Sequence, residues 1–280
     1  MIRLSVRAPA EAGEAVLGAL LELAPSGVEQ SEGPGWVEYA VYGAPGEVPA
    51  LPEGEAEVGG VSVRVRGEEV ADDWGERWKR FHTAVLVGGR LWVRPPWEPP
   101  CERPGVQDIV VDPGQAFGTG AHPTTRGCLE LLLDLPPVGS LADLGCGSGV
   151  VAIAAARLGF GPVVALDYER AAVEATEAGA LANGVQLERV ALADLREEPA
   201  PAAHVVVANL MRPLLLRVAE LMVDPPRWLI LSGLLDREAD EVVGAFAGHA
   251  ERRRVSEHGW TAVLLEGGAG SSPESVIAAP

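Results

Sequence analysis

The sequence predicts an α/β fold in which a doubly wound, mostly parallel sheet follows a small N-terminal α+β domain. From about residue 106, short apolar strands alternate with helical segments, as in a parallel sheet covered on both faces. Residues 1–67 instead alternate apolar and polar positions, which is typical of half-buried strands. Residues 68–105 hold four of the seven tryptophans. We expect this segment to bridge the domains 1–67 and 106–280.

The N-terminal domain is predicted to be a β-α-β-β-β unit. Apolar residues in the range 10–24 are spaced for one helical face, and a Gly-Pro-Gly turn joins two of the strands. Residues 44–60 are rich in Pro, Gly and Glu, and we predict a loop there. The strands are expected at 1–9, 26–33, 35–43 and 61–70.

The remaining elements follow the same patterns. A hairpin is predicted over 83–96 around Gly88 and Gly89. Two closing strands within 251–268 meet at a tight turn and predict an antiparallel edge, and we expect the tail 268–280 to fray. The other strands are expected at 140–145, 162–167, 186–192, 202–209 and 227–233, and the helices at 149–159, 169–184, 212–222 and 236–248.

Composition and charge narrow the class of protein. Apolar residues make up 48% of the chain and the formal net charge is −18, which favours a folded protein and disfavours nucleic acid as a direct partner. The negative charge would steer a basic protein partner toward this chain; the alternative is that it serves only solubility. The start of the chain lacks a signal-peptide pattern, and no apolar run reaches membrane-spanning length. Three cysteines, Cys101, Cys128 and Cys146, suggest neither disulfides nor a metal site. We expect a cytoplasmic monomer without membrane contact.

A glycine-rich turn is the first candidate for chemistry. Gly145, Gly147 and Gly149 follow directly after a predicted strand and precede a helix. Glycines let a ligand approach the backbone, and the helix N-terminus offers free N–H groups. A dinucleotide fingerprint would need glycine or alanine at position 150, which is valine. A tight turn without any ligand is the alternative.

Three acidic residues accompany this turn. Asp167 ends the next strand, where a carboxylate can accept both ribose hydroxyls of a nucleoside, although it could instead cap the following helix. Asp194 follows the third strand and could accept from an adenine amino group, or be an ordinary loop acid. Asp143 precedes the glycines and could orient the loop or meet a cationic ligand. A cationic ligand favours S-adenosylmethionine, which carries a sulfonium and an ammonium, over a dinucleotide whose pyrophosphate must be neutralised.

Asn209 ends the fourth strand beside the same crevice and is the candidate catalytic residue. Its amide oxygen can accept a hydrogen bond from a cofactor or from a substrate amine, and the alternative is a helix cap. Leu210 and Met211 follow it, whereas methyltransferases acting on planar amide or base nitrogens often carry a Pro-Pro-aromatic run there. That subclass is therefore disfavoured.

Several motifs together closely resemble the PrmA family, whose members methylate large-subunit ribosomal protein number eleven. The resemblance covers about 70–260 and rests on "DPGQAFGTGAHPTT" (112–125), on "LADLGCGSG" (141–149), on "ANL" (208–210) and on the tryptophan-rich stretch 73–100. It implies a seven-stranded methyltransferase sheet, S-adenosylmethionine as cofactor, and transfer to lysine or N-terminal amines of a basic ribosomal protein.

The resemblance also assigns residues. It implies that Phe117 packs at the mouth of the site, that Thr124 contacts the cofactor, and that Gly145, Asp167 and Asn209 match further cofactor contacts. By itself, Thr124 could equally cap the helix that follows. His122 could act as a general base, but we expect it to shape the loop, since the nearby sequence offers no carboxylate partner.

The sequence leaves three other functions as alternatives. The proline-rich range 44–60 stands where the family would have a second helix, so another protein substrate is one alternative. A nucleotide-dependent oxidoreductase could use a similar sheet, but the valine at position 150 argues against it. A protein that binds without catalysis would have little use for a hinged loop.

Overall fold

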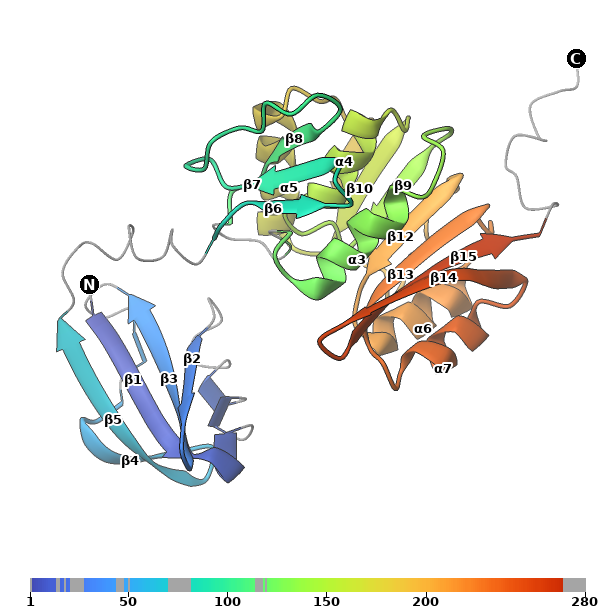
Figure 1. Ribbon diagram of the computed structural model, residues 1–280. Helices are drawn as coiled ribbons and strands as arrows, with labels where there is room; N and C mark the ends of the chain where they lie inside the picture. The colour runs from blue at the N-terminus through green and yellow to red at the C-terminus, as the bar shows by residue number, and fades with distance from the viewer. Residues whose placement is uncertain are drawn as a thin grey trace, which may run out of the picture. The chain divides into compact units, whose positions relative to one another are not determined.

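The chain divides into two compact units, Met1–Phe81 and His82–Pro280 (Figure 1). The division falls inside the range 68–105 that we expected as a bridge, so residues 82–105 group with the second unit. The computed structural model describes residues 2–13, 16–17, 19–20, 28–43, 48–49, 51–69, 82–113, 118 and 120–268.

The first unit contains an antiparallel sheet in the order β2-β3-β1-β5-β4. Its inner face buries alternate residues, such as Leu4 and Val6 of β1, and Val16 and Leu20 belong to the same core. This is the half-buried pattern that the sequence predicts. The elements are β1 (Ile2–Pro9), the short 3-10 helix η1 (Ala10–Ala12), β2 (Glu29–Gly33), β3 (Trp36–Gly43), β4 (Gly54–Val58) and β5 (Val61–Glu69).

The prediction of a loop over 44–60 is wrong for its second half. Residues 54–58 form β4, which pairs with β5 across a turn at Gly59 and Gly60. Within β4, Val58 is buried and Ala56 packs on the core, while the two glutamates are exposed. The alternation was present in the sequence, but the Pro, Gly and Glu around it favoured a loop.

The second unit begins with a small sheet in the order β6-β7-β8. The predicted hairpin is confirmed: β6 (Val85–Val87) and β7 (Leu91–Arg94) are antiparallel and joined through two glycines with positive φ. The sequence analysis missed β8 (Gln107–Val110), which pairs in parallel with β7. It is four residues long and half polar, so no periodicity identifies it.

The seven-stranded, mostly parallel sheet is confirmed. The order is β11-β10-β9-β12-β13-β15-β14, with β14 and β15 antiparallel at one edge. The strands are β9 (Leu141–Leu144), β10 (Val163–Asp167), β11 (Arg189–Leu192), β12 (Val205–Asn209), β13 (Trp228–Leu235), β14 (His249–Glu257) and β15 (Trp260–Gly267). The helices are α3 (Pro123–Leu132), α4 (Val150–Leu158), α5 (Arg170–Ala182), α6 (Arg212–Leu221) and α7 (Ala239–Ala245).

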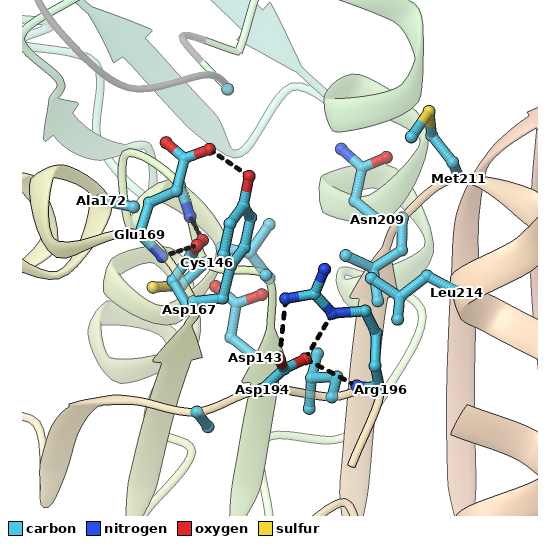
Figure 2. A pocket seen from close by; sticks show the side chains of 18 of the residues that line it. Asp143, Cys146, Asp167, Glu169, Ala172, Asp194, Arg196, Asn209, Met211 and Leu214 are labelled. Carbon is cyan, nitrogen blue, oxygen red and sulfur yellow. Dashed lines mark hydrogen bonds and ion pairs between the residues drawn. The ribbon is translucent and has the colours of Figure 1, made fainter. Parts of the chain in front are cut away.

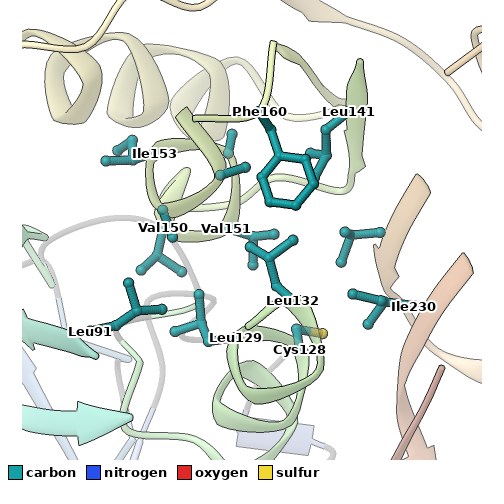
Figure 3. Packing of buried hydrophobic residues seen from close by; sticks show 14 of the residues in the cluster. Leu91, Cys128, Leu129, Leu132, Leu141, Val150, Val151, Ile153, Phe160 and Ile230 are labelled. Atoms are coloured by element: carbon teal, nitrogen blue, oxygen red, sulfur yellow. The ribbon is translucent and has the colours of Figure 1, made fainter. Parts of the chain in front are cut away.

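Helices cover both faces of this sheet. Residues of α3, α4 and α5 share one apolar core with Val205 and Val207 of β12. Residues of α6 and α7 share the other core with Val206 and Ala208 of the same strand (Figure 1). Figure 3 shows the first core, where Leu132 of α3 packs among side chains of α4 and β9. Successive residues of a strand therefore bury opposite faces, which explains the continuous apolar runs in the sequence.

The register brings the carboxyl ends of the central strands level with one another. Leu144 at the end of β9 lies opposite Leu166 of β10 and Ala208 of β12. Asp167 and Asn209, the last residues of their strands, therefore project beyond the same edge of the sheet. Open α/β sheets bind ligands at this edge.

Candidate active site

A pocket of about 520 Å³ opens at the carboxyl ends of β9, β10 and β12. Five of the predicted site residues line it: Gly145 and Gly147 of the glycine turn, Asp167 and Asn209 at strand ends, and Asp194 after β11. Cys146, Asp167 and Glu169 lie on one side of it, and Asn209, Met211 and Leu214 on the other (Figure 2). This volume falls in the range typical of cofactor sites.

The glycine turn has a conformation that only glycine tolerates. Gly145 has a φ of 71°, and a Cβ there would lie 2.4 Å from Cδ2 of Leu210. Gly147 also has a positive φ, and its N–H donates to Oδ2 of Asp167 at 2.9 Å. The turn therefore presents bare backbone to the pocket at the point where α4 begins.

Asp167 holds this turn in place. Besides accepting from Gly147, its Oδ1 accepts from the N–H of Glu169 at 3.0 Å. The alternative in which Asp167 caps the next helix is wrong, because the N-cap of α5 is Glu169. The Asp167 side chain is buried and lines the pocket, so its carboxylate both braces the turn and faces the ligand space.

Asp143 is a buried carboxyl group beneath the turn. It is 3% exposed, lines the pocket, and accepts from the N–H of Ala152 at 3.1 Å. Burial raises the pKa of Asp143 to about 7, with a further contribution from the charge of Asp167, while the Ala152 hydrogen bond opposes the rise. A cationic ligand in the pocket would favour the ionised form.

Asp194 reaches the pocket already paired. Its two carboxylate oxygens accept from the guanidinium of Arg196, each at 2.7 Å. That guanidinium lies 5.5 Å from the centroid of the Tyr168 ring, and all three residues line the pocket. The arginine lowers the pKa of Asp194 through these hydrogen bonds. A ligand amino group would share this carboxylate with Arg196.

Asn209 is held from behind by threonine hydroxyls. Its Nδ2 donates to Oγ1 of Thr124 at 3.3 Å and lies 3.5 Å from Oγ1 of Thr125. The alternatives in which Asn209 and Thr124 cap helices are both wrong. The N-cap of α6 is Met211, and the N-cap of α3 is His122, so Thr124 lies in the first turn of α3. Thr125 lines the pocket, and Thr124 contacts the lining residue Asn209.

The two glycine-rich segments meet at this site. The Ser148 hydroxyl donates to the carbonyl oxygen of Gly118 at 2.7 Å, and Gly118 lines the same pocket as the glycine turn. Both glycine-rich segments therefore border the same pocket. Phe117, expected at the mouth, lies outside the described residues.

Sequence reasoning missed several lining residues. Tyr168 and Arg196 come one and two residues after the predicted acids, so their position beside those acids was the available signal. Met211, Pro213 and Leu214 form an apolar part of the lining, because they begin the helix that follows Asn209. In the sequence, nothing distinguishes Met211, Pro213 and Leu214 from other residues at the start of a helix.

Comparison with known proteins identifies relatives of this chain. Residues 51–266 match the model of the family described as Ribosomal protein L11 methyltransferase (PrmA). A ribosomal protein L11 methyltransferase of Geotalea uraniireducens is 36% identical over 217 residues, which covers 70% of this chain and 68% of the relative. One of Azotobacter vinelandii is 42% identical over 189 residues, covering 65% and 63%. The crystal structure of a ribosomal protein L11 methylase from Lactobacillus delbrueckii subsp. bulgaricus shares the fold, with a TM-score of 0.59 and 24% identity over 67% of this chain and 100% of that one.

The fold and the pocket define a class I S-adenosylmethionine-dependent methyltransferase. The chain belongs to the PrmA family of ribosomal protein L11 methyltransferases. This membership excludes the oxidoreductase alternative. The residues present fit S-adenosylmethionine, since a cationic cofactor would meet the carboxyl groups of Asp143, Asp167 and Asp194 in the pocket lining. Among the described residues, no helix has the length and apolar character needed to cross a membrane.

Proposed function

We propose that this enzyme transfers methyl groups to lysine or N-terminal amines of ribosomal protein L11. The proposal rests on its relatives, which carry the name ribosomal protein L11 methyltransferase at 36% and 42% identity. The net charge of −18 supports a basic protein substrate, since opposite charges steer association, and it disfavours direct contact with nucleic acid. We infer that the enzyme acts as a monomer in the cytoplasm.

We assign the cofactor site to the residues expected from the sequence, with the catalytic contact at Asn209. Asp167 would accept from the ribose hydroxyls, and Asp194 from the adenine amino group while sharing its carboxylate with Arg196. The remaining assignments are Thr124, Gly145, Gly147 and Phe117. The assignment is supported by the shared lining of one pocket for Gly145, Gly147, Asp167, Asp194 and Asn209, with Asn209 opposite Asp167, and by the contact of Thr124 with Asn209; Phe117 rests on the resemblance alone.

S-adenosylmethionine supplies an activated methyl group, so the protein's task is to orient the amine and to exclude water. The attacking amine must be neutral. Apolar residues at the start of α6, Met211 and Leu214 among them, would desolvate it and lower its pKa. The Asn209 amide oxygen would accept from the amine and direct its lone pair toward the methyl group. No strong general base is needed.

We propose that the first unit recognises the protein substrate. It carries its own hydrophobic core, separate from the two cores of the second unit. The resemblance to the PrmA family implies this role for residues 1–67, since the N-terminal domain of that family recognises its ribosomal protein substrate. The family match starts at residue 51, so most of this unit lies outside it. The identity of the protein substrate is therefore tested separately from the methyl transfer itself.

The substrate is tested by incubating the full chain with methyl-labelled S-adenosylmethionine and L11 from the same organism. Peptide mapping by mass spectrometry then locates the label. Label on lysines or on the N-terminal amine is the expected result. Labelling of another ribosomal protein while L11 stays unlabelled would reject L11 and keep the chemistry. A parallel reaction with L11 whose amines are blocked by acetylation should show no transfer.

A further inference from the structure

Three side chains form a continuous hydrogen-bonded row from the edge of the site to Asn209. Nδ1 of His122 lies 2.7 Å from Oγ1 of Thr124, and that oxygen lies 3.3 Å from Nδ2 of Asn209. The first turn of α3 is fixed independently, because the Ser232 hydroxyl donates to the Thr124 carbonyl oxygen at 3.1 Å. The Trp260 ring meets the His122 ring edge-on at 5.2 Å. The row therefore has a defined geometry.

The backbone determines which nitrogen of His122 carries the proton. The N–H of Thr124 can only donate, and it points at Nδ1 of His122 at 3.4 Å, which makes His122 the N-cap of α3. Nδ1 is thus an acceptor. In a neutral imidazole the proton then sits on Nε2.

This tautomer fixes the direction of the next bond. A threonine hydroxyl has one proton, and with Nδ1 as an acceptor at 2.7 Å the Thr124 hydroxyl donates to it. The Thr124 hydroxyl oxygen can then only accept a hydrogen bond from Asn209. An amide turned the other way would set Oδ1 of Asn209 against an oxygen with no proton left to give. The orientation with Nδ2 toward Thr124 satisfies this contact, and in it Nδ2 also lies 3.5 Å from Oγ1 of Thr125, which can accept as well.

We infer that His122 is a positioning residue for methyl transfer, because through Thr124 it orients the Asn209 amide so that Oδ1 remains free to accept from the reacting amine or the cofactor. The inference rests on the proposed role of Asn209. Protonation of His122 would place a donor at Nδ1, release the Thr124 hydroxyl, and allow that hydroxyl to donate to Oδ1 instead. The acceptor would then be lost.

The surroundings of His122 keep it neutral. Burial, followed by the positive charge of Arg126 one turn along α3, lowers the pKa of His122. Arg126 is paired with Glu257 of β14, which partly offsets its charge. The strand β15 contributes Trp260, which carries no charge. The neutral tautomer is therefore the form present at neutral pH.

The kinetic test compares three variants. In His122→Asn the side-chain oxygen keeps an acceptor at the δ position and cannot ionise, so kcat should stay within about threefold of wild type. In His122→Ala and Thr124→Val the row is broken, and kcat should fall by about 10- to 100-fold, the range that misplacement of a reacting group costs. A His122→Asn enzyme as slow as His122→Ala would overturn the inference.

The pH profile separates positioning from a structural role. Wild type should lose kcat on the acid side as His122 protonates, at a pH below the ordinary pKa of histidine, because burial and Arg126 lower the pKa of His122. Titration of the substrate amine affects both enzymes equally, so it cancels in the ratio of the wild-type kcat to the His122→Asn kcat. That ratio should fall with decreasing pH, and a ratio independent of pH would contradict the inference.

The tautomer can be read without any substrate. Nitrogen-15 NMR of labelled histidine, assigned with the His122→Asn variant, should show His122 as the Nε2–H tautomer at pH 7.5. The Nδ1–H tautomer would overturn the inference whatever the kinetics show. Conversely, an Nε2–H tautomer in a protein that transfers no label to L11 would support the row and reject the proposed substrate.

Discussion

The hydroxyl of Ser148 donates a 2.7 Å hydrogen bond to the carbonyl of Gly118, and so joins the loop before α3 to the glycine turn before α4. Ser148 is 4% exposed, and Gly118 lines the same pocket as Gly145 and Gly147 of the glycine turn. One buried bond thus couples two glycine-rich segments that are 30 residues apart in the chain.

Replacing Ser148 by alanine should therefore affect both stability and binding. Loss of the hydroxyl leaves a buried carbonyl without its donor, which costs about 1–3 kcal/mol of unfolding free energy. Cofactor affinity should fall as well, because the loop is no longer tied to the turn. Chemical denaturation and calorimetric titration measure the two effects. Ser62→Ala, at an exposed position of β5, is the control and should change neither. An unaltered midpoint for Ser148→Ala would show that the bond contributes nothing.

The titration of Asp143 should appear in the stability of the free enzyme. Its folded pKa of about 7 lies above that of an unfolded aspartate, so its stabilising contribution is complete at low pH and is lost as pH rises through 7. Between pH 6 and pH 8 this loss amounts to about 1.4 kcal/mol. In Asp143→Asn it should be absent, while the Ala152 N–H keeps an acceptor. Equal pH dependence in the two proteins, measured by urea unfolding, would contradict the assignment.

Asp143 should also make cofactor binding depend on pH. The ionised carboxylate attracts a cationic cofactor, so the affinity of wild type for S-adenosylmethionine should rise from pH 6 to pH 8. The affinity of Asp143→Asn should be lower and nearly constant over this range. Calorimetric titration at both pH values measures it. A steeper rise in the variant than in wild type would assign the dependence to another group.

Asp167 at the end of β10 and Asp194 after β11 should contribute unequally to cofactor affinity. Asp167 both braces Gly147 and faces the pocket, so Asp167→Ala should weaken cofactor binding by at least about tenfold, as the loss of a charge-assisted contact does. Asp194→Ala should cost less, since Arg196 already occupies its oxygens. Asp224→Ala, at an exposed position after α6, is the matched control. A larger loss in Asp194→Ala than in Asp167→Ala would reverse this ranking.

The core between α3 and the sheet should carry much of the stability of the second unit. Leu132 is fully buried among residues of α4 and β9, and truncation to alanine should cost about 2–5 kcal/mol (Figure 3). Leu181 on α5 is 82% exposed, and its truncation should cost less than about 0.5 kcal/mol. Denaturant midpoints compare the two. Similar losses would mean that burial does not set the cost here.

The large sheet could be predicted because its central strands, β9, β10, β12 and β13, are apolar runs that alternate with helical segments. The polar residues at the strand ends indicated the site for the same reason: parallel strands end at one edge, and Asp167 and Asn209 end the two strands that flank β9. Strands β4 and β8 were missed, because short strands with exposed polar residues carry little periodicity.

The partners of the site residues could not be predicted. Asn209 and its partner Thr124 are 85 residues apart, and nothing in either segment indicates the other. His122 was expected to shape the loop, but its role as the cap of α3 depends on a backbone angle that the sequence does not display. Side-chain pairing across elements is decided by packing, which local patterns do not encode.

The central claim is that the pocket at the ends of β9, β10 and β12 performs methyl transfer through Asn209. The most direct test is single-turnover transfer from labelled S-adenosylmethionine to L11 by wild type and Asn209→Ala, with cofactor affinity measured in parallel. We expect Asn209→Ala to lower the transfer rate by about 10- to 100-fold at saturating cofactor. An unchanged rate in a variant that binds the cofactor normally would remove Asn209 from the chemistry and contradict the account.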